Sequence, residues 1–215
     1  MIVVGKPHKV GQAESNVDQV HALELFAKKH FSVEEVVYRW GGQHYRPADF
    51  LPYIGELNEN EYVATGFSTD GLVYGTLAAM MIADQIGECE NEYLELYDPK
   101  RHQPLKSAKE FAKENLDVAK QLLDLIPSFK DGDYQHILPG EGDVIEKDGH
   151  KLAVYKREDG EIVVLSAQCT HLHCIVNWNN AEKSWDCPCH GSRFKTDGSV
   201  LEGPALKPLP NTGEV

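Results

Sequence analysis

Four of the five cysteines in this 215-residue chain fall in two short clusters near its C-terminus. The clusters read CTHLHC at 169–174 and CPCHGS at 187–192. A C-x-H pair and a C-x-x-H pair each place two ligands on one tight loop, and two such loops can close on one metal centre. The sequence therefore predicts a metal site whose donors are Cys169, His171, Cys187 and His190.

Two kinds of centre fit this donor set. Two cysteines and two histidines complete a structural zinc site. They also suit a [2Fe-2S] cluster in which two histidines replace two cysteines on one iron. A zinc site leaves Cys174 and Cys189 without a role, which favours the iron-sulfur cluster. A zinc site is kept as the alternative.

The full pattern resembles the Rieske iron-sulfur proteins, whose two boxes read C-T-H-L-G-C and C-P-C-H-G-S. The likeness continues through FKTDGSVLEGPALKPLP at 194–210 and covers about the last 80 residues of the chain. It implies that Cys169 and Cys187 bind one iron through thiolates. It also implies that His171 and His190 bind the other iron through ring nitrogens.

Further positions of the boxes carry roles that the resemblance implies. Cys174 and Cys189 fall where respiratory-type members have a disulfide that links the two loops. Ser192 occupies the position of a hydroxyl that donates a hydrogen bond to the cluster. His173 departs from the family pattern, because it stands where the box has glycine.

The first half of the chain shows helix and strand patterns. SNVDQVHALELFAKKHF at 15–31 predicts a helix whose first turn Ser15 can cap, and GLVYGTLAAMMIADQI at 71–86 predicts another. Strands are predicted from the apolar or β-branched runs at 1–5, 33–40 and 61–68.

Beyond residue 88, a charged helix is expected to start with Ser107 as its cap and to end by Pro127. From about residue 131 the chain has short β-type runs, such as HKLAVYK and EIVVLSA, separated by Gly and Asp turns. This pattern is typical of a small antiparallel β domain.

Three stretches of the first half resemble, in order, the C-terminal part of FAD-dependent oxidoreductases of the D-amino-acid oxidase and glycine oxidase class. They are IVVGKPHKVGQ at 2–12, RWGGQHYRPADFLPYIGEL at 39–57 and YVATGFSTDGLVYGTLAAMMIADQI at 62–86. The resemblance implies that Arg46 binds a substrate carboxylate. It also implies that the flavin ring is approached by the backbone of Thr69, Asp70, Gly71 and Leu72.

The dinucleotide-binding fingerprint G-x-G-x-x-G of that class is absent from these 215 residues. FAD is therefore expected as a cofactor of an intact enzyme whose adenine-binding half lies outside this sequence. The chain is accordingly expected to be a C-terminal fragment, a truncated product or one half of a split enzyme.

The expected fold class is α+β, with an incomplete α/β flavoenzyme-like segment followed by an all-β Rieske domain of antiparallel sheets. The expected parts are the oxidoreductase-like segment at 1–87, a helical connector at 88–130 and the Rieske domain at 131–215. In the expected function, the cluster exchanges single electrons with the flavin during oxidation of an amine or amino acid. The alternatives are a non-enzymatic electron carrier with an N-terminal docking segment, and a zinc-stabilised binding protein.

Composition and charge limit the partners. With 21 Lys and Arg against 34 Asp and Glu, the formal charge of −13 opposes nucleic acid and anionic membrane surfaces. No apolar run approaches the ~18 residues of a spanning helix, and no signal-peptide pattern opens the chain, so a cytoplasmic location is expected. The expected partner is a redox protein or a flavin domain. A homo-oligomer is also expected, because an incomplete domain leaves a strand edge exposed.

Overall fold

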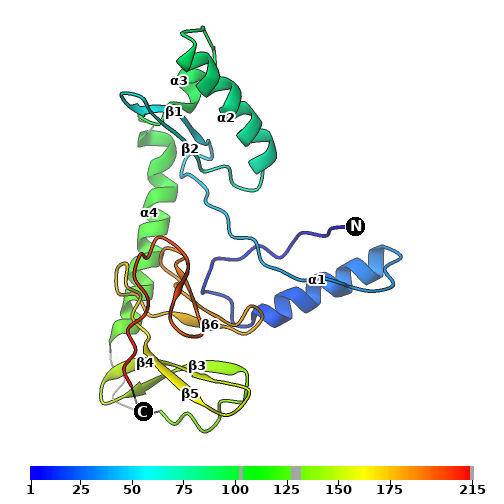
Figure 1. The fold of residues 1–215 in the computed structure, drawn as a ribbon, viewed down its shortest axis with the longest axis vertical. Helices are drawn as coiled ribbons and strands as arrows, with labels where there is room; N and C mark the ends of the chain where they lie inside the picture. Colours follow the sequence, from blue (N-terminus) through cyan, green and yellow to red (C-terminus); the bar gives the residue numbers. More distant parts are fainter. Residues whose placement is uncertain (102–103, 127–131, 214–215) are drawn as a thin grey trace. The chain divides into compact units, whose positions relative to one another are not determined.

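A computed structural model describes residues 1–101, 104–126 and 132–213, although not the side chains of 104–111. The chain divides into two compact units, one made of Met1–Gly41 with Asp117–Val215 and one made of Gly42–Leu116. The predicted boundary between residues 130 and 131 lies outside the described residues. Figure 1 labels the elements of both units, which are taken separately below.

The Gly42–Leu116 unit is built on a hairpin and a helix. β1 (Tyr53–Asn58) pairs antiparallel with β2 (Glu61–Thr65), and α2 (Gly71–Ile86) packs against them. α3 (Leu94–Tyr97) follows, and its ends pack on the same small core. The fully buried members of that core are Ile54, Ala78 and Met81. The helix predicted at 71–86 is therefore confirmed, and the strand predicted at 61–68 ends at Thr65.

The C-terminal part of the other unit is all β, as the sequence predicts. Three strands form one antiparallel sheet in the order β3 (Glu141–Lys147), β4 (His150–Lys156) and β5 (Ile162–Ser166). Four short strands form a second, in the order β6 (Asn177–Asn179), β7 (Ser184–Asp186), β8 (Arg193–Lys195) and β9 (Val200–Glu202). The largest core cluster includes Leu165, Val176, Trp185 and Phe194 together with three of the box cysteines.

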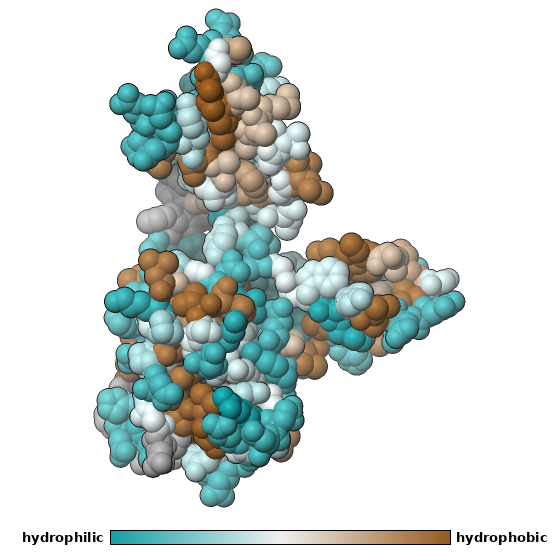
Figure 2. All heavy atoms as spheres, in the orientation of Figure 1, coloured by the Kyte–Doolittle hydropathy of each residue, from teal (hydrophilic) through white to brown (hydrophobic). Residues whose placement is uncertain are grey.

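α1 (Asn16–His30) belongs to the same unit as these sheets. The Ser15 hydroxyl accepts a hydrogen bond from the Asp18 amide, so the predicted cap is present. The side-chain oxygen of Asn180, in the turn between β6 and β7, accepts from the amides of Asn16 and Val17. The start of α1 is thus held on the β6–β7 hairpin, while Leu25 and Phe26 farther along it remain exposed. Figure 2 shows apolar surface along this helix.

Two predicted strands are wrong. Residues 1–5 and 33–40 form no strand, and Ile2 and Val4 are 73% and 86% exposed. A β-type run becomes a strand only where a neighbouring strand accepts its hydrogen bonds, and no described strand pairs with either segment.

The helix predicted to begin after Ser107 begins earlier. α4 (Pro104–Gln121) starts at a proline, which suits a first helical position because that position needs no amide donor. A 3-10 turn, η1 (Leu122–Leu125), continues it. Among the described residues, every helix is too short or too polar to cross a lipid bilayer.

Candidate metal centre

The two cysteine boxes form two loops of the second β-sheet region. CTHLHC lies between β5 and β6, where the amide of Cys169 donates to the carbonyl of Cys174 at 2.8 Å. CPCHGS connects β7 to β8, where the amide of Cys187 donates to the carbonyl of Ser192 at 2.8 Å. Each box is therefore closed on itself by backbone bonds, and its side chains are held at fixed positions.

A buried ion pair fixes the strands on either side of the second box. Asp186 directly precedes Cys187, and Arg193 directly follows Ser192. The Arg193 guanidinium donates to the Asp186 carboxylate at 3.0 Å, with side-chain exposures of 10% and 4%. Asn179 donates to the other oxygen of the same carboxylate at 2.8 Å. Because both charges are paired and hydrogen-bonded, the hairpin that carries the box is rigid.

Two of the four box cysteines, Cys169 and Cys187, have free thiols, and both are buried. A hydrogen bond from Cys187, together with bonds from backbone amides and Ser192, lowers the pKa of the Cys169 thiol to about 6 against the opposing effect of burial. The same contact and burial raise the pKa of Cys187. These surroundings therefore stabilise the Cys169 sulfur in its anionic form, the form that binds metals, with the Cys187 thiol as its hydrogen-bond donor.

The two box histidines lie edge to face, with ring centroids 4.9 Å apart. The Nδ1 atoms of His171 and His190 are both buried, and neither has a hydrogen-bond partner among the described residues. Burial, and then the neighbouring His171, lower the pKa of His190 and so favour a neutral ring. Two imidazole rings whose buried nitrogens have no partner among the described residues, next to two buried thiols, fit the donor set of a metal centre with mixed ligands.

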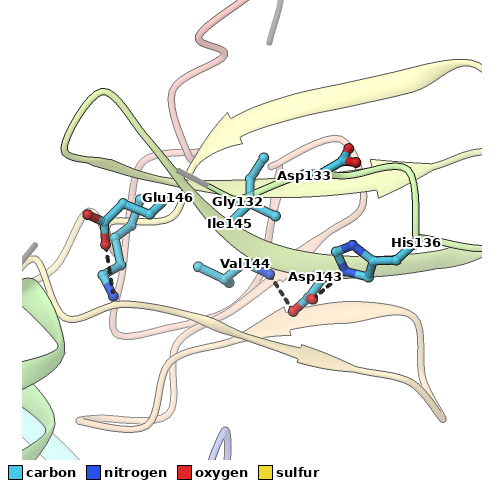
Figure 3. A pocket seen from close by; sticks show the side chains of 8 residues that line it. Gly132, Asp133, His136, Asp143, Val144, Ile145 and Glu146 are labelled. Carbon is cyan, nitrogen blue, oxygen red and sulfur yellow. Dashed lines mark hydrogen bonds and ion pairs between the residues drawn. The ribbon is translucent and has the colours of Figure 1, made fainter. Parts of the chain in front are cut away.

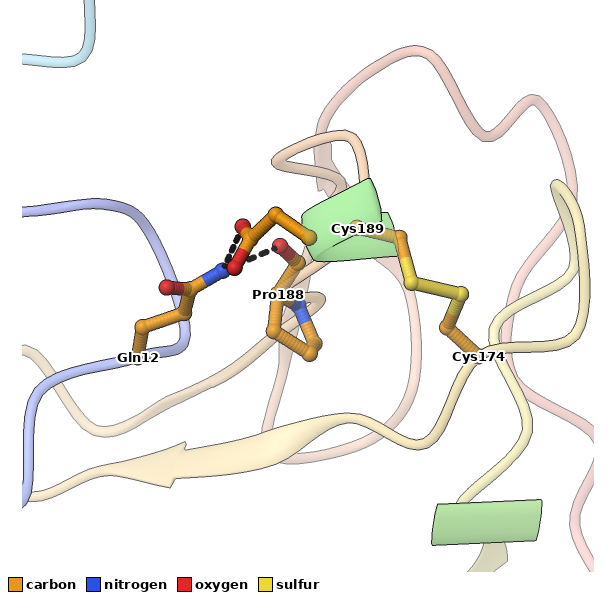
Figure 4. Close-up of a disulfide and its surroundings, with 5 residues drawn as sticks. Gln12, Cys174, Pro188 and Cys189 are labelled. Atoms are coloured by element: carbon orange, nitrogen blue, oxygen red, sulfur yellow. Dashed lines mark hydrogen bonds between the residues drawn. A yellow bond between two sulfur atoms is a disulfide. The ribbon is translucent and has the colours of Figure 1, made fainter. Parts of the chain in front are cut away.

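The remaining box cysteines are joined to each other. Cys174 and Cys189 form a disulfide that links the two loops, with Cα atoms 6.4 Å apart (Figure 4). Their sulfur atoms lie within 4.8 Å of the Cys187 sulfur. Since bonded sulfurs are not available as thiolates, the boxes offer Cys169 and Cys187 as sulfur ligands.

A third loop covers the boxes from the side of β9. The Ser192 hydroxyl accepts from the amide of Ala205 at 3.0 Å, and Thr170 donates to the carbonyl of Lys207 at 2.6 Å. The Gly203–Pro204 peptide in this loop is cis. The loop thus fixes one member of each box.

His173, which replaces the family glycine, has a φ of 62°, a left-handed conformation that glycine favours.

The residues that the resemblance places near flavin lie in the Gly42–Leu116 unit. Asp70 is the N-cap of α2, and Leu72 is 91% exposed in its first turn. Arg46 is exposed, with its guanidinium 4.8 Å from the centre of the Phe50 ring. The amide of Ser68 donates to the carbonyl of Tyr45 at 3.2 Å, so the loop next to Arg46 and the turn before Thr69 are neighbours.

Arg101 is a structural residue of that unit which sequence patterns did not indicate. Its guanidinium binds both carboxylate oxygens of Asp49, at 2.8 and 3.0 Å, and donates to the carbonyls of Leu51 and Pro52. The partners are 52 residues apart in sequence, so no local spacing signals the pair. Arg101 holds together the loop that also carries Arg46.

A groove lies elsewhere on the β domain, along β3 and the turn before it (Figure 3). His136 and Asp143 form a hydrogen-bonded pair at its edge, with 2.9 Å between ring nitrogen and carboxylate. That bond raises the pKa of His136. None of the cysteine-box residues lines this groove.

Comparisons with known proteins match both halves of the chain. The Rieske [2Fe-2S] domain family matches residues 129–213, and the FAD dependent oxidoreductase family matches residues 2–85. The chain is 36% identical over 208 residues to YhfW of Bacillus subtilis (strain 168), named as a candidate Rieske 2Fe-2S iron-sulfur protein. This match covers 95% of the chain and 41% of that relative.

The β domain also matches shorter proteins. The cytochrome b6-f complex iron-sulfur subunit of Chlorobaculum thiosulfatiphilum is 35% identical over 78 residues, which cover 36% of the chain and 42% of the relative. The crystal structure of a cyanobacterial plasma membrane Rieske protein from Synechocystis is 35% identical, with a TM-score of 0.30. That likeness covers 32% of the chain and 73% of the solved one.

The chain thus combines regions that match two protein families, one in each half. It carries a Rieske [2Fe-2S] domain, whose cofactor is a [2Fe-2S] cluster, joined to a segment of the FAD-dependent oxidoreductase family. It spans less than half the length of the first two curated relatives.

Proposed function

We propose that the protein is the electron-transferring portion of a flavin-dependent oxidoreductase that acts on an amine or amino acid. The cluster would be held by Cys169, His171, Cys187 and His190. When bound, FAD accepts two electrons and a proton from the substrate, and the cluster carries one electron at a time. The observation that carries the proposal is the pairing of buried thiols and unpartnered histidine nitrogens in a chain that also matches the oxidoreductase family.

The chain's own residues have distinct parts in this proposal. The thiols and rings would bind the irons, Ser192 would donate a hydrogen bond to a cluster sulfur, and the disulfide and the 203–207 loop would exclude water from the centre. Arg46 would orient the substrate carboxylate, and the α2 start from Thr69 to Leu72 would approach the flavin ring by its backbone. In the proposed division, residues 1–87 form the oxidoreductase-like part, 88–130 the connector and 131–215 the Rieske domain.

A non-enzymatic electron carrier is the second candidate. The observation that favours it is the contact of the first 41 residues with the β domain, since they cluster in one compact unit with it. In this case the N-terminal segment would serve the Rieske domain as a docking element.

Electron paramagnetic resonance of the dithionite-reduced chain tests the cluster. Iron, sulfide, zinc and flavin would be measured on the same sample. A rhombic signal with the low average g of histidine-ligated clusters, with two irons and two sulfides per chain, is the expected result. A silent spectrum with one zinc per chain would overturn the proposal. If the chain joined to an adenine-binding half gives the cluster signal but binds no FAD, the electron carrier is favoured.

A further inference from the structure

A side chain from the start of the chain contacts the second cysteine box. The Gln12 amide nitrogen donates to the backbone carbonyl of Pro188 at 3.1 Å and to the Asp117 carboxylate at 2.8 Å. Pro188 lies between Cys187 and Cys189, and Figure 4 shows Gln12 reaching this carbonyl beside the disulfide. Gln12 belongs to the segment that matches the oxidoreductase family, yet it lies at the candidate metal centre.

The position of Gln12 is fixed by its neighbour. Gly11 has a φ of 68°, and a β-carbon added there would lie 2.5 Å from the carbonyl oxygen of Asp186. The Asn177 side chain donates to the Gly11 carbonyl at 2.7 Å. The backbone therefore runs directly against the box, and only glycine permits this approach.

The other partner of Gln12 is a charged group that is itself paired. Lys9 donates to the Asp117 carboxylate at 2.7 Å, and the bonds from Lys9 and Gln12 lower the pKa of Asp117. Asp117 thus stays ionised and accepts from both side chains. The carboxylate holds the Gln12 amide in the orientation that points its second N–H at Pro188.

We propose that Gln12 is a positioning residue of the iron-sulfur centre, which fixes the second box and raises the reduction potential of the cluster. The Pro188 carbonyl belongs to the same peptide unit as the Cys189 amide, which hydrogen-bonds the Cys187 sulfur, so polarising this carbonyl strengthens the bond to the sulfur. A donor on that carbonyl withdraws electron density and so favours the reduced cluster. The inference rests on the proposed ligand set, and it places a determinant of the potential outside the Rieske domain.

The test compares variants of the full chain loaded with cluster. Gln12→Leu keeps the volume of the side chain and removes both donors. Its reduction potential, from a redox titration followed by electron paramagnetic resonance, is expected to be lower than that of the wild type. Release of iron to a chelator is expected to be several-fold faster. Gln12→Lys restores a donor and adds a positive charge, so its potential is expected at or above the wild-type value.

Asn180→Ala is the matched control, because the Asn180 side chain holds the same N-terminal segment through Ser15, Asn16 and Val17, and within the described part of the chain it has no hydrogen bond to either box. Its potential is expected to equal that of the wild type. A wild-type potential in Gln12→Leu, or an equal shift in Asn180→Ala, would overturn the inference. Either result leaves the cluster signal intact, whereas absence of that signal in the wild type would instead overturn the proposed function.

Discussion

Gly11 and Pro188 lie in contact, and a β-carbon at Gly11 would sit 2.8 Å from the backbone nitrogen of Pro188. The two residues are far apart in sequence and match different families. Their contact means that the oxidoreductase-like segment is part of the surroundings of the cysteine boxes.

Gly11→Ala is expected to destabilise strongly the unit formed by Met1–Gly41 and Asp117–Val215. The added methyl meets backbone atoms that cannot move aside, and the left-handed backbone disfavours any side chain. Gly149→Ala is the control, because Gly149 has a similar φ of 76° but open space around it. Urea unfolding followed by tryptophan fluorescence should give a loss of about 1–2 kcal/mol for the control. Gly11→Ala should lose about 1–3 kcal/mol more, since overpacking adds to the backbone strain. Equal losses would contradict the close contact.

Replacement of one proposed ligand is expected to abolish cluster binding. Cys169→Ser removes a buried thiol beside Cys187, and a hydroxyl is a poor ligand for iron in such a cluster. Cys89→Ser removes the exposed thiol outside the boxes and should leave iron, sulfide and the resonance signal at wild-type levels. Full iron content in Cys169→Ser would remove this residue from the ligand set.

The disulfide is expected to stabilise the unit without supplying a ligand. Cys174 and Cys189 are 15 residues apart, and closure of such a loop stabilises a fold by about 3 kcal/mol in the chain-entropy description. The Cys174→Ala, Cys189→Ala double variant should therefore unfold at lower urea while it still gives the cluster signal when freshly loaded. Loss of the signal in the loaded double variant, with Cys169 and Cys187 intact, would contradict this division of roles.

Local patterns predicted the loops of the two boxes and the helices at 15–31 and 71–86, because the information lies within a few residues, whereas the start of α4 at Pro104 was missed. The cap at Ser15, the helix at 71–86 and the loop positions of the cysteines all follow from short-range spacing. The runs at 1–5 and 33–40 failed as strands because a strand requires a partner, which a local pattern does not reveal. Gln12 and Arg101 were missed for the same reason, since their partners lie 176 and 52 residues away.

The proposed flavin contact can be tested at two glycines of α2. Added β-carbons at Gly71 and Gly75 would meet nothing within 4 Å, so both should accept valine without a clash. Gly71→Val would project a side chain where the backbone is proposed to meet the flavin ring. In a protein that joins this chain to an adenine-binding half, we expect FAD affinity, from fluorescence titration, to fall more than about tenfold, or about 1.4 kcal/mol. Gly75→Val, one turn along the helix, should change it less than twofold. Equal affinities of the two variants would contradict the contact.

The pair of Arg101 and Asp49 gives a prediction for stability against pH. Both side chains are only 5% exposed, and the hydrogen bond from Arg101 lowers the pKa of Asp49. A carboxyl whose folded pKa is lowered contributes stability above its unfolded pKa of about 3.9, and this contribution is lost as pH falls through the folded value. Arg101→Leu should therefore cost about 3–5 kcal/mol at pH 7, because it leaves a buried carboxylate without its partner.

The cost of Arg101→Leu should shrink below about pH 4, where Asp49 becomes protonated in the variant and needs no cation. Arg39→Leu is the control, because the Arg39–Glu24 pair is half exposed on the arginine side and such surface pairs contribute little to stability. Urea unfolding of both variants across pH 3–7 measures the difference. A loss for Arg101→Leu that matches the control at pH 7 would mean that the buried pair does not hold the Arg46 loop in place.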